Sequence, residues 1–235
     1  MDTNEIRTRE TVGQLLAEAS RSFFLPNDLE KTLGGVTRSA VGLIDGADCA
    51  DILMIDGRKG FKSHASTSDL PIRLDELQEE LQEGPCVDAA RRDIVVRSDN
   101  LKADERWPRF GPAAVDAGVH STLSFQLYTD DGAVGALNVF GKAPDAFSDE
   151  DEEIGTMLAT HAAIALYTAG KAEQFRSALA SRDVIGQAKG MIMERYDIDA
   201  VRAFELLSKL SQDVNLSVAD LARDIVERGS EKPGH

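Results

Sequence analysis

Cysteines, long apolar runs and prolines are scarce in this sequence of 235 residues. The two cysteines, Cys49 and Cys86, form neither a metal-ligand spacing nor a disulfide framework, which indicates a reduced, cytoplasmic setting. No apolar run approaches the length of a membrane span, and the charged N-terminus lacks the apolar core of a signal peptide, so we expect no membrane association. With 7 prolines and 42% hydrophobic residues, the composition is typical of a globular chain.

Catalytic motifs are also missing. The sequence contains no phosphate-binding loop, no nucleophile elbow and no carboxylate motif with a defined partner. His64 and His120 lack metal-like spacing, and His161 falls on an apolar helical seam where packing is the simpler role. The sequence therefore predicts a protein that is not an enzyme and that needs no metal or cofactor.

Basic residues are fewer than acidic residues, and the excess of acidic residues is unevenly distributed along the chain. The net charge is -15, which by itself argues against nucleic acid because phosphates repel an acidic surface. Residues 171–235, however, carry ten Lys and Arg against eleven Asp and Glu, so -14 of the net charge lies in residues 1–170. The C-terminal part is close to neutral and can present a local basic face.

Residues 1–170 alternate between helical and strand periodicities. Apolar residues at helical spacing predict helices, and short apolar or alternating runs between turn residues predict strands. We expect helices over residues 3–22, 28–44, 73–82 and 86–91, and strands over residues 49–55, 61–67, 93–97, 120–129 and 133–140. The turn Asp130-Asp131-Gly132 predicts that the last two strands form an antiparallel hairpin.

A long helix is predicted from Ser148 onward, where Ser148 and Asp151 form a capping box. The apolar positions that follow come close to a heptad seam and lead into residues 171–179, with Gly170 as the one weak point. Two interpretations stay open. The helix can pair with its copy in a dimer, or it can pack on the sheet of its own chain.

The C-terminal segment predicts three helices, and the first carries an unusual surface. In residues 181–193, Ile185 and Ile192 share the apolar face, whereas Arg182 and Lys189 leave together from one flank of it. A helix with one packed face and one basic flank is a candidate docking surface. The alternative is that Arg182 and Lys189 form an ordinary solvent-exposed flank with no partner.

The other two C-terminal helices follow after short breaks. The second spans residues 199–214 and is expected to bury four apolar side chains at helical spacing: Val201, Phe204, Leu207 and Leu210. The third begins with a capping box formed by Ser217 and Asp220, and Gly229 is expected to end it. So small a bundle has a modest core, so we expect support from the connecting helix or from a second subunit.

A set of residues keeps the order and spacing of one known family across these three helices. The set is Ser181-Arg182, Ile185, Gln187-Ala188-Lys189-Gly190, Met193, Arg195, Ala203-Phe204, Leu207, Ser211, Asn215, Asp220, Ala222 and Ile225-Val226. With it, the C-terminal segment resembles the ANTAR family of RNA-binding antiterminator domains, whose members are known as dimers that bind paired stem-loops in nascent RNA. The resemblance implies RNA contacts by Arg182, Gln187, Lys189, Arg195 and Lys209.

A second resemblance covers residues 28–169. It is carried by Gly84-Pro85-Cys86-Val87-Asp88-Ala89, Arg106-Trp107-Pro108, Ala114, Gly118-Val119, Ser121 and Gly135-Ala136-Leu137-Asn138-Val139. These features are similar to a GAF sensor domain, which implies an α+β fold with an antiparallel sheet flanked by helices. We expect an N-terminal helix in residues 1–26, the GAF-like domain in 27–169, the three-helix ANTAR bundle in 170–230, joined by the long helix, and a flexible tail in 231–235.

Two hypotheses for function follow. The first is a dimeric RNA-binding antitermination regulator under GAF control, with an unknown small-molecule ligand near Cys86 and Trp107; packing in the core is the alternative role for both side chains. The second is a small-molecule sensor whose C-terminal bundle binds a protein partner. Two features favour the second: the net charge of -15, and the absence of a basic residue from Leu216-Ser217-Val218-Ala219, where ANTAR members often carry Lys or Arg. Ser208 also stands where a basic residue is common, which fits weaker or gated RNA binding.

Overall fold

The computed structural model describes residues 29–55, 60–91, 94–129 and 132–230. The helix predicted over residues 3–22, the turn residues Asp130 and Asp131, and the tail 231–235 therefore lie outside the described residues. The chain divides between Ala169 and Gly170 into two compact units, called here the N-terminal unit and the C-terminal unit. No described helix is both long enough and apolar enough to cross a membrane.

The N-terminal unit is built on one antiparallel sheet of five strands in the order β2-β1-β5-β4-β3. The strands are β1 (Cys49–Ile55), β2 (Phe61–His64), β3 (Val95–Ser98), β4 (Ser121–Thr129) and β5 (Gly132–Gly141). The predicted hairpin is confirmed, because β4 and β5 pair over their whole length, from Ser121 opposite Gly141 to Thr129 opposite Gly132.

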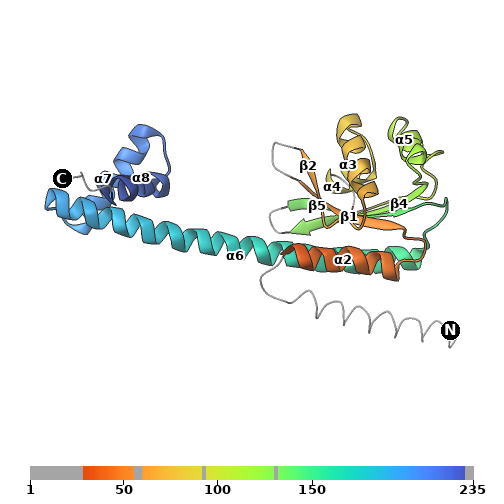
Figure 1. The fold of residues 1–235 in the computed structure, drawn as a ribbon, viewed down its shortest axis with the longest axis horizontal. Helices are drawn as coiled ribbons and strands as arrows, with labels where there is room; N and C mark the ends of the chain where they lie inside the picture. The colour runs from red at the N-terminus through yellow and green to blue at the C-terminus, as the bar shows by residue number, and fades with distance from the viewer. Residues whose placement is uncertain (1–28, 56–59, 92–93, 130–131, 231–235) are drawn as a thin grey trace, which may run out of the picture. The chain divides into compact units, whose positions relative to one another are not determined.

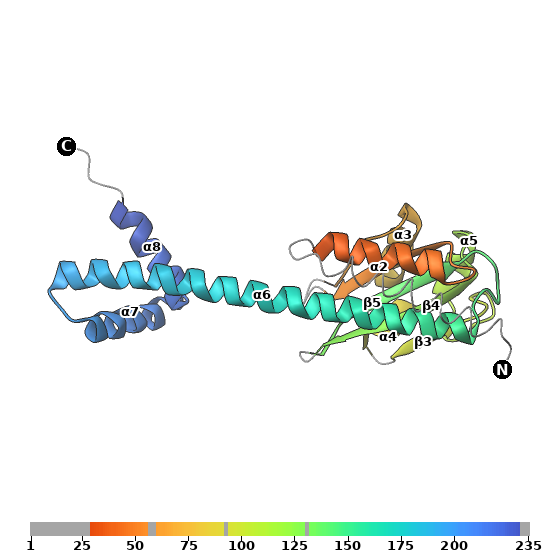
Figure 2. The same ribbon diagram turned by 90° about the horizontal axis from the view of Figure 1, so that it is seen from below.

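Helices cover both faces of this sheet (Figures 1 and 2). On one face α2 (Leu29–Leu43) and the first part of α6 (Asp149–Tyr196) pack on a core that includes Ile52, Phe125 and Leu137. On the other face lie α3 (Asp69–Leu81), α4 (Pro85–Arg91) and α5 (Phe110–Asp116). Successive strand residues point to opposite faces, so β1, β3 and β5 supply side chains to both cores. The predicted α+β fold class is confirmed.

Three predicted elements of this unit have different limits. Helix α3 begins at Asp69 rather than at Arg73, because Pro71 stands in the first turn, where a backbone N–H has no partner within the helix. Strand β2 ends at His64 rather than at Thr67, because Ala65 has a positive φ of 50°, which breaks the extended conformation. Strand β3 is described from Val95 to Ser98, later than the predicted 93–97.

Helix α6 is a single helix of 48 residues, and the predicted weak point at Gly170 does not interrupt it. The predicted capping box opens it: Ser148 N donates to Asp151 Oδ2 at 2.8 Å, and Asp151 N donates to Ser148 Oγ at 3.3 Å. Early in the helix Gly155 lies directly on Phe125, since a Cβ there would stand 2.1 Å from the Phe125 ring. The absence of a side chain at Gly155 thus sets the close approach of α6 to the sheet.

The C-terminal unit consists of the last part of α6 with α7 (Ala200–Val214) and α8 (Val218–Ser230). Asp199 caps α7 by accepting hydrogen bonds from Val201 N and Arg202 N, both at 2.9 Å. The predicted capping box of Ser217 and Asp220 opens α8. Five fully packed residues form the centre of the bundle: Ala188, Ile192, Ala203, Leu207 and Ala222.

The predicted core of α7 is largely wrong. Leu207 is buried, but Val201, Phe204 and Leu210 are exposed. Helix α7 buries only the narrow line of Ala203, Leu207 and Ser211, because a bundle of three short helices covers one stripe of each helix and leaves its flanks in water. Gly229 also does not end α8. It lies within the last turn, against the side chain of Met191.

Candidate functional site

Arg182 and Lys189 line one hollow of the C-terminal unit. They are seven residues apart on α6, so their side chains leave the helix within about 20° of each other. The hollow has a volume of about 560 Å³ between α6 and α7, and its remaining lining is Ala178, Ser181, Ile185, Gly186 and Phe204. Two cations at the mouth of a partly apolar hollow can hold an anionic ligand that also has an apolar face.

The other three predicted RNA contacts lie elsewhere. Gln187 and Arg195 are exposed, but each leaves α6 about 140° away from Arg182, on the other side of the helix. Lys209 is exposed on α7 and does not line the hollow. Of the five predicted residues, then, the structure brings together Arg182 and Lys189.

Phe204 is the residue of the hollow that sequence analysis assigned to another role. Helical periodicity predicted it as core, but its side chain is 45% exposed. Periodicity identifies an apolar stripe, whereas the width of the stripe that neighbours cover is a tertiary property. No signal in the sequence separates Phe204 from Leu207.

Cys86 and Trp107, the predicted ligand contacts, are packed into the core beneath α3, α4 and α5. Cys86 is fully buried; its backbone N–H donates to Gln78 Oε1, and its Sγ accepts from Gln78 Nε2, both at 2.9 Å. Trp107 is 1% exposed, and its Nε1 donates to Asp88 Oδ2 at 2.8 Å. A ligand could touch either side chain only if these helices moved.

A buried polar row crosses the same face of the sheet next to Cys86. Asp51, Asn138 and Ser124 stand opposite one another on β1, β5 and β4, and all three are fully buried. Asn138 Nδ2 donates to Asp51 Oδ1 at 3.0 Å, and Ser63 Oγ donates to Asp51 Oδ2 at 2.7 Å. Sequence analysis missed this row, although an aspartate inside the apolar run CADILMI was a signal for it.

Asp75 of α3 completes this polar cluster from above the sheet. As an ionised carboxylate Asp75 would have no donor for its two oxygens among the described residues, whereas a protonated Asp75 can donate to the Asp51 carboxylate. Asn138 Oδ1 has no donor among those residues either. Burial, followed by the nearby charge of Asp51, raises the pKa of Asp75 to about 10, and burial also raises the pKa of Asp51. Burial and Asp75 together raise the pKa of the Cys86 thiol well above its usual value, so Cys86 is a thiol at neutral pH and a poor nucleophile.

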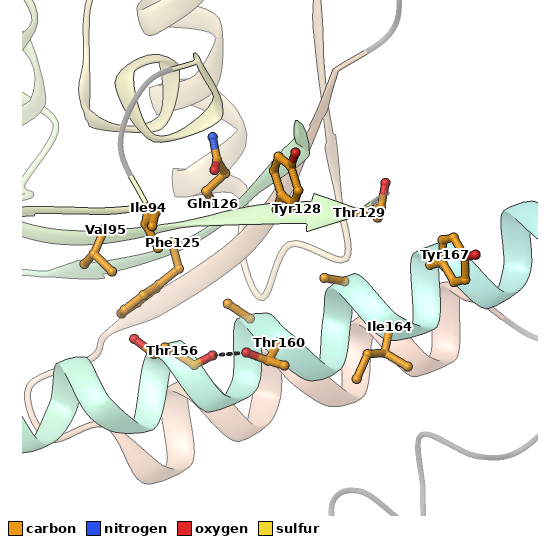
Figure 3. Close-up of a pocket in the computed structure, with 12 residues that line it drawn as sticks. Ile94, Val95, Phe125, Gln126, Tyr128, Thr129, Thr156, Thr160, Ile164 and Tyr167 are labelled. Atoms are coloured by element: carbon orange, nitrogen blue, oxygen red, sulfur yellow. Dashed lines mark hydrogen bonds between the residues drawn. The ribbon is translucent and has the colours of Figure 1, made fainter. Parts of the chain in front are cut away.

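A separate apolar cleft of about 370 Å³ lies on the opposite face of the sheet, against α6 (Figure 3). Phe125 and Val95 face it from the strands, and Thr160 and Ile164 face it from the helix. The Thr160 hydroxyl is occupied, because it donates to Thr156 O of its own helix at 2.9 Å. No side chain that lines this cleft carries a full charge at neutral pH, so the cleft suits apolar contact rather than recognition of an ion.

Metal ligands are not grouped in the described part of the chain: no three His, Cys, Asp or Glu side chains there are placed to hold an ion. His64, one of the histidines considered from sequence, has its Nδ1 2.8 Å from Glu30 Oε1.

Two family models match the chain. The model of the GAF domain matches residues 26–166, which is more than half of the sequence, and the model of the ANTAR domain matches residues 173–226. Both matches fall where the sequence features of the two resemblances lie. No curated protein matches the chain.

Solved structures that contain GAF domains or phytochrome modules resemble this chain in fold. The GAF domain of a phosphoenolpyruvate-protein phosphotransferase from Coxiella burnetii aligns with a TM-score of 0.56 and 18% identity, over 73% of this chain and 99% of that one. The corresponding GAF domain from Acinetobacter aligns with a TM-score of 0.54 and 18% identity, over 74% of this chain and 99% of that one. The photosensory core module of a Stigmatella aurantiaca phytochrome aligns with a TM-score of 0.59 and 13% identity, over 86% of this chain and 45% of that one. At such identities the likeness concerns the fold alone.

Proposed function

Because this chain belongs to the GAF–ANTAR proteins, with a GAF domain followed by an ANTAR domain, we propose that it is a dimeric regulator that binds RNA. In this proposal the ANTAR domain captures tandem stem-loops of nascent transcripts in the cytoplasm and prevents termination. The GAF domain controls that capture. The protein acts by binding and catalyses no reaction.

The observation that carries the proposal is the pair of cations in the hollow of the C-terminal unit. Arg182 and Lys189 converge there, on the one part of the chain that is close to electroneutral. Cations bind RNA largely by neutralising its phosphates and releasing counterions. Two phosphate contacts in each subunit would become four in a dimer. With four contacts, raising the salt from about 50 to about 200 mM should weaken RNA binding about 50- to 150-fold.

Dimerisation through α6 is supported by apolar side chains that α6 leaves in water. Met157, Ile164 and Tyr167 are exposed in the N-terminal unit, and Phe175 and Leu179 are exposed in the C-terminal unit. All side chains of residues 171–180 are exposed, although a helical segment in water gains little stability of its own. Pairing with the same helix of a second copy would cover these side chains.

Control by the GAF domain is supported by two features of the N-terminal unit. Its buried acidic cluster pairs the carboxyls of Asp51 and Asp75 and leaves Asn138 Oδ1 without a donor among the described residues, so a change of protonation or a bound ligand would affect it. Its helix α6 also contributes to the C-terminal unit, so a change in the packing of α6 alters the segment that is proposed to pair.

Crosslinking of the protein to cellular RNA, followed by sequencing, tests the proposal. We expect enriched transcripts with tandem stem-loops, and salt-sensitive binding of those RNAs by the purified full chain. The charge reversals Arg182→Glu and Lys189→Glu should abolish RNA capture and leave the dimer intact in light scattering. Arg195→Glu, a charge reversal on the other side of α6, is the matched control and should weaken capture far less. Failure to recover any RNA would refute the proposal.

A protein partner is the second candidate function, and the exposed apolar surface of α7 favours it. Val201 and Val214 of α7, and Leu216 just after it, are exposed in the C-terminal unit. The four residues that follow Asn215, Leu216-Ser217-Val218-Ala219, include no Lys or Arg. Under this alternative the charge reversals on α6 would leave binding of the partner nearly unchanged, and Val201→Asp would abolish it.

A further inference from the structure

The hollow between α6 and α7 is lined by cationic side chains and by an aromatic ring. One wall carries the cations Arg182 and Lys189, and the other carries the exposed ring of Phe204. The rest of the lining is Ala178, Ser181 and Gly186, which are small, and the apolar side chain of Ile185. Apart from the adjacent residues and backbone of its own helix, no atom lies within 4 Å of the place where a Cβ on Gly186 would stand. The hollow is therefore lined by small and apolar side chains between the cations and the ring, which suits a flat apolar group.

Phe204 is not needed for the centre of the bundle. The packed core of the C-terminal unit is formed around Ala203 and Leu207, its neighbours on α7, while the Phe204 side chain is nearly half exposed. An aromatic ring that is held by a helix but not buried offers a π-face to a ligand. Because α7 is capped at both ends, by Asp199 and by Asn215 in the left-handed conformation, the ring is carried on a fixed helix.

Unpaired bases of RNA are bound in this way. Single-stranded loops expose bases that stack on aromatic side chains, while nearby cations hold the phosphates on either side. A protein segment would satisfy the ring but would need acidic side chains for the cations, whereas a nucleotide supplies a planar apolar face and an anion in one unit. The combination of a ring and two cations therefore suits a nucleotide better than it suits a protein segment.

We propose that Phe204 is a stacking platform for one unpaired base of the RNA loop, with Arg182 and Lys189 on the flanking phosphates. This inference rests on the proposed function, since it names how the ANTAR domain would hold RNA. It adds a contact that carries no charge and that depends on the planar ring.

The ring and the cations have separable signatures in binding measurements. Loss of a stacked base weakens binding by about 5- to 150-fold, and it leaves the salt dependence unchanged because no counterion is released by stacking. Removal of a cation lowers affinity and also flattens the slope of log Kd against log salt. Phe204→Leu keeps an apolar side chain of similar volume but loses the ring. Phe204→Trp keeps a ring.

The test uses the full chain and a tandem stem-loop RNA recovered by crosslinking, with 2-aminopurine placed at each loop position in turn. We expect quenching at one position with the native protein and with Phe204→Trp, and loss of that quenching together with weaker binding for Phe204→Leu. Leu210→Ala, which truncates an exposed apolar residue on another side of α7, is the control and should bind normally. Circular dichroism checks that each variant is folded.

The outcomes separate the two proposals. If Phe204→Leu binds like the native chain while the charge reversals at Arg182 and Lys189 still abolish capture, stacking is overturned and the RNA-binding function stands. If Phe204→Leu flattens the slope of log Kd against log salt as a charge reversal does, the ring only positions the cations, and stacking is again overturned. If no variant and no native protein binds RNA, both proposals fall.

Discussion

The carboxyl of Asp75 should make the stability of the N-terminal unit depend on pH. The side chain is 6% exposed, and its pKa is raised from 3.8 to about 10, so it is protonated at neutral pH in the folded protein. In the unfolded chain the same group ionises with its ordinary pKa. Folding at neutral pH therefore takes up a proton. The stabilising contribution is complete below about pH 4 and is lost as the pH rises toward about 10.

Asp75→Asn removes this proton uptake, because an amide stays neutral in both states. One pKa unit corresponds to about 1.4 kcal/mol, so the interval from the unfolded pKa to pH 7 bounds the effect at about 4 kcal/mol. The amide also keeps a donor that can face Asp51. Allowing for relaxation around the buried group, we expect the variant to raise the free energy of unfolding by about 1–3 kcal/mol at pH 7. The gain should grow with pH and disappear near pH 4.

Urea unfolding at several pH values measures this difference, and the fluorescence of Trp107 reports it. Trp107 is the single tryptophan of the chain and is buried in the same unit as Asp75. Glu76→Gln, an exposed neighbour on α3, removes one acidic group at the surface and serves as the control. A variant no more stable than the native chain at pH 8, or a gain that does not change with pH, would refute the reasoning.

Three further substitutions or reactions test other parts of the structure. Gly155→Ala should destabilise the N-terminal unit by about 1–3 kcal/mol in the same urea assay, because the new Cβ meets the ring of Phe125. Asp199→Ala should lower the melting temperature of the C-terminal unit, measured by thermal circular dichroism, since two N–H groups at the start of α7 lose their acceptor. Cys49 and Cys86, whose thiol pKa values are raised by burial, should react with iodoacetamide at pH 8 only after unfolding, as followed by mass spectrometry.

Local signals of the sequence were sufficient for most of the elements. Strand periodicity located the β4–β5 hairpin, and the spacing of Ser148 with Asp151 and of Ser217 with Asp220 located two helix starts. These features depend on residues close together in the chain, so their physics is present in the sequence itself. The limits of α3 were missed because Pro71 looks like a barrier to a helix, although the first turn tolerates it.

Features that depend on neighbours far away in sequence could not be predicted in the same way. The row of Asp51, Asn138 and Ser124 exists because three strands align in one register, and Asp75 joins it because α3 lies over that face. Each of these residues looks ordinary in its own segment. The pKa of Asp75 is likewise a property of its burial beside Asp51, which only the folded chain creates.

The sequence by itself determined the two-part organisation, the family resemblances and the basic flank of Arg182 and Lys189, because local order and helical spacing fix all three. Tertiary structure decided which residues join that flank. Gln187 and Arg195 leave α6 on its other side, and Phe204 stays exposed beside the cations because the small bundle covers only a narrow stripe of α7. Periodicity names the apolar residues of a helix, whereas packing decides which of them water can reach.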